Sequence, residues 1–410
     1  MNLRDRINRI DEKVILFVIM FGLSLIKGWH SPHRWTYTNY VVNYGYGFMR
    51  RGLLGTISTT ILGTHAYEYE YIFYFMLILF ALMVILLIVL TLQLISKDKS
   101  FITPAIIFAA SPIVVFLSSE FGFLDEVGLL LILAYIFVVW NFGKRLTGLS
   151  IVVLTSFISI ATILIHEGQV IMFGPVLMLT TLIFFIERAT PIKKTFAALT
   201  FLAMLMFVTS VAVVRFGTLE TSYVDEIEDS IRSKVNFSIA SPTFSAIHWD
   251  TEEASTRTLE RWTSSSRYYL LLLSALINLP TQTILLWWGK RRVGVIADKT
   301  VRRMVFAMFI ITAISPYALN LVGIDMHRWN SLSVVTTFLG LMLVCRFVKD
   351  RVDTPTISFA ALILFVFISA MSTNFLYNAQ PVHLYPFVNL FDKLTAFFLE
   401  GARFPVLPQF

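Results

Sequence analysis

Long apolar segments separated by short polar ones run along most of the chain. A helix needs about 20 apolar residues to cross the hydrocarbon core of a bilayer, and eleven segments meet this requirement. Their expected bounds are 14–30, 71–95, 101–118, 123–142, 148–165, 168–187, 193–215, 268–288, 304–322, 329–347 and 356–375. The pattern predicts an all-α polytopic membrane protein of about eleven transmembrane helices, with residues 1–410 as a single transmembrane domain.

The composition supports this class. Hydrophobic residues make up 57% of the chain and charged residues only 14%, whereas soluble domains carry about 25% charged residues. The first apolar stretch, Val14–Trp29, lacks a small-residue cleavage site, so we expect it to remain as a span. The single cysteine, Cys345, excludes an internal disulfide and a cysteine-based metal site.

Lys and Arg are concentrated in every second connection between the predicted spans. Short loops rich in these residues stay in the cytoplasm, so the N-terminus is expected inside and the C-terminus in the periplasm. The net charge of +7 then reflects topology and does not indicate a nucleic-acid partner. The basic residues of the connections that are expected in the cytoplasm are Arg4, Arg6, Arg9, Lys13, Lys97, Lys99, Lys144, Arg145, Arg188, Lys193, Lys194, Lys290, Arg291, Arg292, Lys299, Arg302, Arg303, Arg346, Lys349 and Arg351.

The first outer segment, 31–70, carries two adjacent arginines before an apolar run. The run 52–64, GLLGTISTTILGT, has apolar residues at helical spacing and predicts a helix in the membrane interface. Arg50 and Arg51 precede it, and a helix N-terminus with two guanidinium groups favours phosphate binding. The alternative is that both arginines snorkel to the interface beside aromatic residues.

The turn between the spans 148–165 and 168–187 contains His166 and Glu167. Apolar runs flank the pair so closely that both side chains are expected at the membrane edge. A His–Glu pair at that depth can acquire a pKa suited to proton transfer. No second histidine follows at the spacing of a zinc metalloprotease. The alternative is a polar hairpin tip without chemistry.

Two further outer turns carry charged residues. Asp125 stands at the start of one span, where it is either a base, an arginine partner or a helix N-terminal charge. Asp325 and Arg328 precede another span, three residues apart, and can pair on one helical face, with His327 between them. In this pattern Arg328 is a phosphate-binding candidate held by Asp325.

Two features of the predicted outer side of the protein concern its shape rather than its chemistry. Ser-Pro pairs at 111–112 and 315–316 lie within predicted spans, and a proline there frees a carbonyl that neighbouring groups must satisfy, often beside a cavity. The long periplasmic loop, 216–267, is the only large polar segment, and both of its halves are compatible with short helices that cap the membrane domain. Such a cap is either a lid over a site or a solvated loop.

Arginines, carboxylates and a His–Glu pair on one side of an aromatic-rich bundle resemble a known group. The layout is similar to the integral-membrane glycosyltransferases of bacterial surface polysaccharides, a GT-C-like superfamily that includes O-antigen polymerases, O-antigen ligases and phage-type O-antigen glucosyltransferases. The resemblance covers most of the chain and depends on its many spans, on the outer motifs YGFMRRG, HEG and DMHRW, and on the late outer loop.

The resemblance favours one branch of this group. The acidic motif that usually follows the first span is missing, because HSPHRWTYTNY contains no Asp or Glu. This points away from a metal-dependent mechanism and toward the polymerases and ligases, in which arginines hold a lipid diphosphate without a metal. The polymerases often carry Arg-x10-Gly in outer loops, a spacing that Arg34 and Gly45 match.

The residues and the resemblance together give one hypothesis. The expected activity is glycosyl transfer, most similar to an O-antigen polymerase, at the periplasmic face of the bacterial inner membrane. The donor is an undecaprenyl-(di)phosphate-linked glycan, and no cofactor or metal is implied. A glycan acceptor, membrane lipid and polysaccharide-assembly proteins are the expected partners. The catalytic candidates are Glu167, His166, Asp125 and Asp325, and the phosphate-binding candidates are Arg50, Arg51, Arg328, Arg34 and His327.

Three alternatives remain open. The first is a phage-type glucosyltransferase that adds one side-branch sugar. The second is a transporter of a lipid-linked glycan or small molecule, although ionisable residues crowd at one face and the span centres look apolar. The third is a non-catalytic scaffold, for which alanine at Arg50, Glu167 and Asp325 would have no effect.

Overall fold

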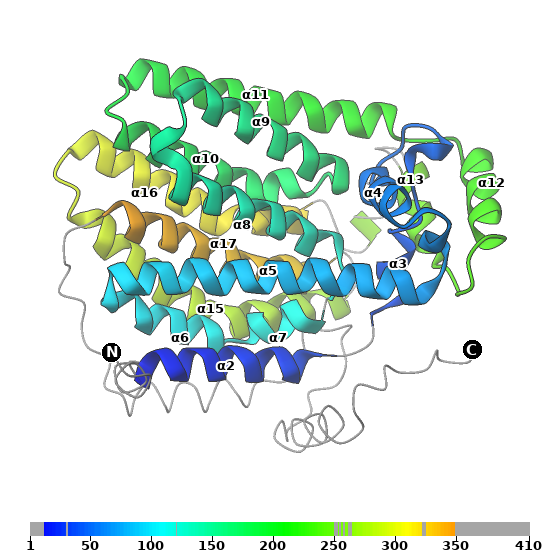
Figure 1. Cartoon of the computed structure of the whole chain (residues 1–410), viewed down its shortest axis with the longest axis horizontal. Coiled ribbons are helices and arrows are strands. Elements are labelled where there is room, and N and C mark those ends of the chain that lie inside the picture. The colour runs from blue at the N-terminus through cyan, green and yellow to red at the C-terminus, as the bar shows by residue number, and fades with distance from the viewer. Residues whose placement is uncertain are drawn as a thin grey trace, which may run out of the picture.

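All the regular elements that the structure describes are helices (Figure 1). The computed structural model describes residues 12–348, except 30–31, 120, 250–252, 254–255, 257–258, 261–264 and 322–324. Figure 1 shows long helices running side by side in a bundle, with a group of short helices at one end. The predicted all-α class is therefore confirmed for the described residues.

The last predicted span, 356–375, lies outside the described residues. Most of the long helices coincide with the predicted spans to within three residues, but α15 ends six residues later than predicted, and α16 begins five residues and ends eight residues earlier than predicted. Their bounds are α2 Glu12–Gly28, α5 Tyr69–Lys97, α6 Ile102–Ala110, α7 Pro112–Ser119, α8 Leu124–Phe142, α9 Gly148–Ile165, α10 Gln169–Glu187, α11 Ile192–Phe216, α15 Ser265–Gly294, α16 Lys299–Ile314 and α17 Met326–Phe347. Short 3-10 turns, η3 Lys99–Phe101 and η4 Gly143–Arg145, join some of them.

Seven helices of the described chain are long and apolar enough to cross a membrane. The number becomes eight if the bent pair α6 and α7 is one span. The described chain is therefore that of a multi-pass α-helical membrane protein. The apolar helix α2, with 17 residues, packs along α6 and α7, and α15 packs along α17.

The predicted span 101–118 is not one straight helix. It bends by 53° between α6 and α7, at Ser111–Pro112. Proline has no N–H to continue the helical ladder. The helix α2 supports the bend, because Ser24 Oγ donates to the carbonyl of Ala109 at 2.8 Å and Ser118 Oγ donates to the carbonyl of Leu25 at 2.6 Å. The second Ser-Pro pair also ends a helix, since α16 gives way to the 3-10 helix η5, Ser315–Leu321.

The helices α17 and α11 differ in how much of each is buried, which makes α17 central and α11 peripheral in the bundle. In the most apolar window of α17, 89% of the residues are buried inside the protein, against 22% for α11. The core of α17 also carries a buried polar stripe, which the sequence did not predict. The amide of Asn330 donates to Ser274 Oγ at 2.7 Å, and that of Gln282 donates to Thr337 Oγ1 at 3.2 Å. Neutral side chains thus join α15 to α17 by interhelical hydrogen bonds.

The short helices form a cap at the right-hand end of the bundle in Figure 1. The predicted interfacial helix at 52–64 is the helix α4, and the predicted long outer loop supplies α12 and α13, so both regions are helical as expected. Val224, Ile227 and Ile231 give α12 a buried apolar face. The bounds are α3 Arg34–Thr38, η1 Tyr44–Tyr46, α4 Gly52–Leu62, η2 Gly63–Tyr67, α12 Thr221–Arg232 and α13 Ser241–His248.

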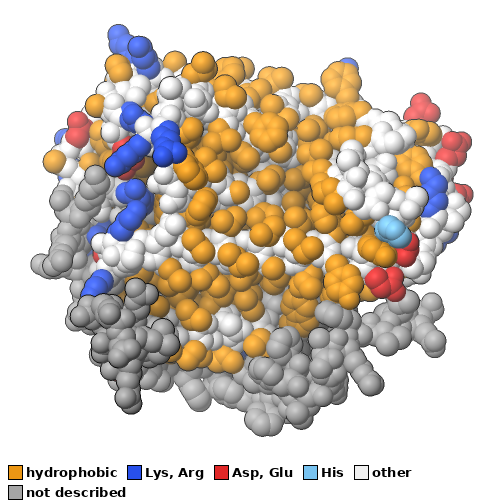
Figure 2. Space-filling view, viewed as in Figure 1, with side chains coloured by type: hydrophobic (Ala, Val, Ile, Leu, Met, Phe, Trp, Pro, Cys, Tyr) orange, Lys and Arg blue, Asp and Glu red, His pale blue; other side chains and the backbone are white. Residues whose placement is uncertain are grey.

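The visible surface is divided along the bundle. Figure 2 shows hydrophobic side chains over the middle, most of the Lys and Arg of this face at the end away from the cap, and acidic side chains over the cap. A belt of exposed apolar side chains between two polar ends is the surface that a bilayer requires. The division places the cap and the basic loops on opposite sides of that belt.

Candidate functional site

Six of the nine predicted site residues meet where the cap joins the bundle. The turn between α9 and α10 supplies His166 and Glu167, and the residue before α4 supplies Arg51. The first turn of α8 supplies Asp125, and the start of α17 supplies Asp325 and Arg328. Four segments that are far apart in the chain therefore contribute to one group of charged side chains.

Arg51 and Glu167 form a two-pronged ion pair. Arg51 Nε donates to Glu167 Oε2 at 3.2 Å, and Arg51 Nη2 donates to Glu167 Oε1 at 2.7 Å. The side chains are 24% and 19% exposed, so a ligand can reach them without unfolding the cap. Two parallel hydrogen bonds are the geometry in which a guanidinium binds a carboxylate or a phosphate most strongly.

The backbone of Arg51 is strained. Arg51 is the N-cap of α4 with φ 62° and ψ 11°, in the left-handed region. A side chain with a Cβ rarely occupies this region, and such strain persists where the surrounding contacts determine it. The helix α4 begins immediately afterwards, at Gly52. The strained turn therefore directs the Arg51 side chain toward the α9–α10 turn.

Charge pairing sets the protonation of this pair. Burial raises the pKa of the Glu167 carboxyl, but the Arg51 guanidinium more than offsets this and holds the pKa well below its usual range. Burial likewise lowers the pKa of Arg51, and Glu167 raises it above its usual value. Both groups are therefore charged at neutral pH, and Glu167 is a weak base while Arg51 is bound to it.

His166 does not pair with Glu167 as the sequence suggested. Its Nδ1 accepts a hydrogen bond from the backbone N–H of Gly168 at 3.0 Å. Burial, together with Arg51, lowers the pKa of the imidazole to about 4, so the ring is neutral at pH 7. With Nδ1 as the acceptor, the proton is assigned to Nε2. In this arrangement His166 is a hydrogen-bond donor and shapes the turn.

A second ion-pair group lies beside the first. Arg328 Nε lies 3.0 Å from Asp125 Oδ2, and Arg328 Nη1 lies 3.3 Å from Asp325 Oδ2. The side chains of Asp125 and Arg328 are only 6% and 12% exposed. Asp125 and Arg328 also affect the pKa of Arg51, which shows that the two groups interact electrostatically. The predicted pairing of Asp325 with Arg328 is confirmed, and Asp125 is an additional partner.

Several buried residues around the start of α8 hold Asp125 in place. The carboxylate of Glu126 accepts a hydrogen bond from the N–H of Gly122 at 2.8 Å, and Tyr40 donates to the carbonyl of Gly122 at 2.8 Å. Gly122 has φ +86°, a conformation that favours glycine. Gln169 donates to the carbonyl of Leu124 at 2.7 Å. These contacts fix the turn that precedes α8 and thereby the position of its first carboxylate.

The two adjacent arginines have different partners. Arg50 is buried, and its Nη2 donates to the carbonyls of Ile247 at 3.1 Å and Trp249 at 2.6 Å. Its backbone N–H donates to the carbonyl of Gly217 at 3.0 Å. Arg50 therefore fastens the segment before α4 to the cap. Arg51 is the member of the pair that faces the charged group.

The remaining predicted residues lie around this group. Arg34 is exposed at the start of α3, and among the described residues no hydrogen bond or ion pair joins its side chain to Arg51 or Glu167. His327 lies next to Arg328 on α17, partly buried. Within the described ranges, no three His, Cys, Asp or Glu side chains are grouped so that they could hold a metal ion.

His166 makes the stability of the protein sensitive to mild acid. Between pH 6.5, its usual pKa, and about 4, an unfolded chain binds a proton that the folded protein does not. The free energy of unfolding therefore falls as the pH drops through this window. We expect His166→Asn, which keeps an acceptor for the Gly168 N–H, to lose less Tm between about pH 7 and about pH 5 than the wild type. The control is His65→Asn in the exposed turn η2, and equal losses in all three proteins would contradict the assignment.

The chain was compared with protein-family models, with curated proteins and with solved structures. No family model, no curated protein and no solved structure matches it.

Proposed function

We propose that the protein transfers a glycosyl group from a polyprenyl-(di)phosphate-linked glycan to a glycan acceptor at the outer face of the membrane. The observation that carries the proposal is the two-pronged Arg51–Glu167 pair beside the Arg328–Asp125–Asp325 group. Arginines suited to phosphate and carboxylates suited to proton removal stand within one partly open site. An O-antigen polymerase-like reaction is the form of this activity that the outer motifs support best.

The ion pair supplies a way to switch the base on. A donor phosphate has the same two-pronged geometry as the Glu167 carboxylate and competes with it for Arg51. When the phosphate takes Arg51, the carboxylate loses the cation that holds its pKa down, and burial then raises that pKa. Glu167 thus becomes a better base only when the donor is bound. Asp125 and Asp325 remain paired with Arg328.

The transfer step then follows ordinary glycosyl chemistry. Glu167 takes the proton of the acceptor hydroxyl, whose oxygen forms a bond to the anomeric carbon of the donor. The bond between that carbon and the phosphate oxygen breaks, and the electron pair leaves with the lipid (di)phosphate. Arg51 stabilises the charge that builds on the leaving phosphate, and Arg328 is the second cation at hand. His166 donates through Nε2 to a substrate oxygen.

The proposal includes a topology. In addition to the seven or eight candidate spans, α2, α15 and the segment 356–375 cross the membrane, which gives about eleven spans. The N-terminus is cytoplasmic and the C-terminus periplasmic, and the membrane is the inner membrane of a bacterium. The gathering of Lys and Arg at the end of the bundle away from the cap supports this orientation.

Transport of a polar or lipid-linked substrate is the second candidate function. The observation that favours it is the buried polar stripe between α15 and α17, in which Asn278 and Gln282 lie almost completely buried. Polar side chains within a bundle line many substrate paths. The stripe is neutral, however, and the ionisable residues of the site lie outside it, so transfer remains the first proposal.

The test is the surface polysaccharide of a strain that lacks the gene, complemented with wild type, Arg51→Gln or Arg232→Gln. Arg232 is the matched control, because its exposed side chain also pairs with a glutamate, Glu228 of α12. We expect the deletion and Arg51→Gln to lose the long-chain ladder on a gel and Arg232→Gln to keep it. An intact ladder that lacks one sugar by mass indicates a side-branch transferase. An unchanged pattern in the deletion strain contradicts glycosyl transfer.

A further inference from the structure

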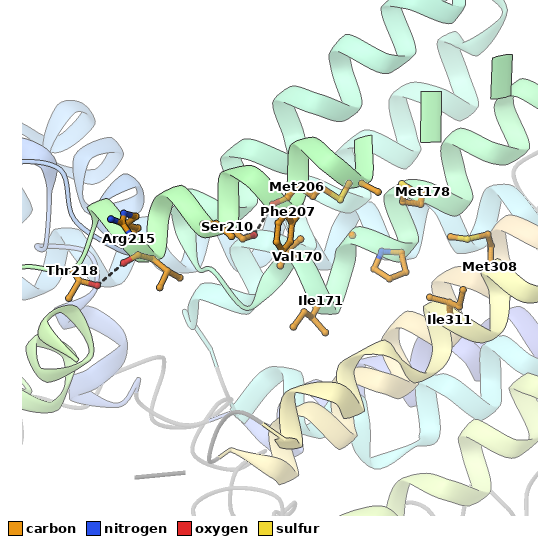
Figure 3. A pocket seen from close by; sticks show the side chains of 15 residues that line it. Val170, Ile171, Met178, Met206, Phe207, Ser210, Arg215, Thr218, Met308 and Ile311 are labelled. Atoms are coloured by element: carbon orange, nitrogen blue, oxygen red, sulfur yellow. Dashed lines mark hydrogen bonds between the residues drawn. The ribbon is translucent and has the colours of Figure 1, made fainter. Parts of the chain in front are cut away.

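A groove runs along the outside of the bundle, between helices that also border the candidate site. It has a volume of about 1120 Å³ and lies between α10, α11 and α16. Figure 3 shows Val170 and Ile171 of α10, Phe207 and Ser210 of α11, and Met308 of α16 around it. The volume exceeds the 300–1,000 Å³ of typical small-molecule pockets. The occupant is therefore expected to be a large ligand.

The lining of the groove is almost entirely apolar. Ser210 Oγ donates to the carbonyl of Met206 at 2.8 Å, and Thr218 Oγ1 donates to the carbonyl of Val214 at 2.7 Å, so each hydroxyl already has a backbone acceptor. From Ala203 to Arg215 the groove follows α11 for about 18 Å at 1.5 Å per residue. This is more than half of the roughly 30 Å thickness of a hydrocarbon core.

The groove opens toward lipid. Its wall α11 exposes many large apolar side chains, including Phe201, Phe207 and Val211. A groove of this kind on a membrane-spanning helix is reached from within the bilayer. Its occupant is therefore expected to be a lipid chain rather than a water-soluble molecule.

One cation stands at the end of the groove near the cap. Arg215 lines the groove and is exposed, and in the described chain no hydrogen bond or ion pair occupies its guanidinium. Two residues later, Gly217 accepts the backbone hydrogen bond of Arg50. On the other wall, Val170 lies three residues beyond Glu167. The cationic end of the groove therefore adjoins the candidate site.

We propose that this groove binds the hydrocarbon chain of a long-chain isoprenoid phosphate and that Arg215 binds the phosphate next to the chain, which leaves Arg51 to the phosphate that carries the sugar. An apolar channel with a single cation at one end matches an amphiphile that has one long chain and one anionic head. The inference deepens the proposed function, because the lipid is then the carrier of the donor glycan. Binding at this site does not require turnover and is tested separately.

The occupant is distinguished from ordinary membrane lipid by its head and chain. A zwitterionic phospholipid carries a cationic group that Arg215 repels, and it has two chains where the isoprenoid phosphate has one. An isoprenoid alcohol of equal length fills the groove but offers no charge to Arg215. The phosphate should therefore bind more tightly than the alcohol, and Arg215 should be the cause of that difference.

The experiment measures binding of an isoprenoid monophosphate and of the isoprenoid alcohol of the same length to the purified full-length protein by native mass spectrometry. Ala203→Trp fills the groove, and Val208→Trp on the lipid-facing side of α11 is its control. We expect Ala203→Trp to weaken binding of both lipids at least about tenfold and Val208→Trp to leave both unchanged. Equal binding by Ala203→Trp and the wild type would overturn the proposal.

Arg215→Gln provides an independent measurement that remains valid if the tryptophan variant fails to fold. We expect it to abolish the preference for the phosphate over the alcohol, whereas Arg145→Gln in η4, at the other end of the bundle, keeps that preference. The assignment is contradicted if Arg215→Gln still prefers the phosphate over the alcohol. It is also contradicted if a zwitterionic phospholipid displaces the isoprenoid phosphate as readily as it displaces the alcohol. If Glu167→Gln still transfers sugar while the groove binds the phosphate, the proposed base is wrong and the lipid site stands.

Discussion

Replacing Glu167 with glutamine is expected to lower glycosyl transfer by about three orders of magnitude, within the range that a general base contributes. Glutamine has the same shape and retains an oxygen that can accept from Arg51, so the contact between α4 and the α9–α10 turn persists. It cannot accept the proton of the acceptor hydroxyl. The measurement is the transfer rate of purified protein with lipid-linked donor and acceptor, and unchanged Tm shows that the variant is folded.

The role of Arg51 in this step has its own signature. Arg51 holds the pKa of Glu167 well below its usual range. In Arg51→Gln the carboxylate of the free enzyme keeps its burial and loses the cation, so its pKa rises, and the acid limb of the pH profile of kcat/KM, measured on the residual activity of the purified protein, should move to higher pH. Glu228→Gln in the cap is the control for the loss of one carboxylate in Glu167→Gln. Normal transfer by Glu167→Gln would make the pair a structural tie between cap and bundle.

The sequence predicted the helices well because each span is defined by local hydrophobicity. The described helices α9 and α10, for example, lie within one residue of the predicted bounds. A bilayer requires such runs to be continuous, so their ends are visible in the chain. The bend at Ser111–Pro112 also has a local cause, although its size of 53° depends on how α2 packs against the bent pair.

Apart from the pairing of Asp325 with Arg328, the partners of the charged residues were not visible in the same way. Arg51 and Glu167 are 116 residues apart, and only the tertiary arrangement brings them together. Adjacent arginines looked equivalent in the sequence, but the left-handed backbone at Arg51 separates their directions. His166 and Glu167 looked like a pair, and the hydrogen bond to the Gly168 N–H takes the imidazole instead. Neighbours in sequence are thus poor guides to partners in a turn.

The buried polar stripe was missed for a related reason. Asn330, Ser333 and Thr337 stand among apolar residues of α17, and average hydrophobicity conceals them. Their importance depends on facing Ser274 and Gln282 of α15, a contact between distant segments. Hydrogen bonds between neutral side chains are a recognised means of joining helices in lipid. The spacing of polar residues within a span is the signal that could have indicated this contact.

Replacing Arg328 with glutamine is expected to destabilise the protein by about 3–5 kcal/mol, the cost of leaving a buried charge without its partner. Asp125 is 6% exposed, and its carboxylate makes no side-chain hydrogen bond in the described part of the chain, so the ion pair with Arg328 is what stabilises its charge. The side chain of Asp325 is 36% exposed and therefore hydrated, so its charge loses less stabilisation when Arg328 is replaced. Arg51 is close enough for Asp125 to affect its pKa, which limits the loss.

The double variant Asp125→Asn/Arg328→Gln separates charge from packing. It removes both charges and leaves two neutral amide side chains, so most of the lost stability should return. Arg232→Gln, which removes an exposed arginine from its pair with Glu228 on α12, is the control and should cost no more than about 1 kcal/mol. The measurement is denaturant unfolding of the wild type and the three variants in the same detergent.

If the double variant is as unstable as Arg328→Gln, the loss of stability comes from lost packing of the Arg328 side chain against Phe123. If it is stable but inactive, the group serves the reaction, because folding no longer needs its charges.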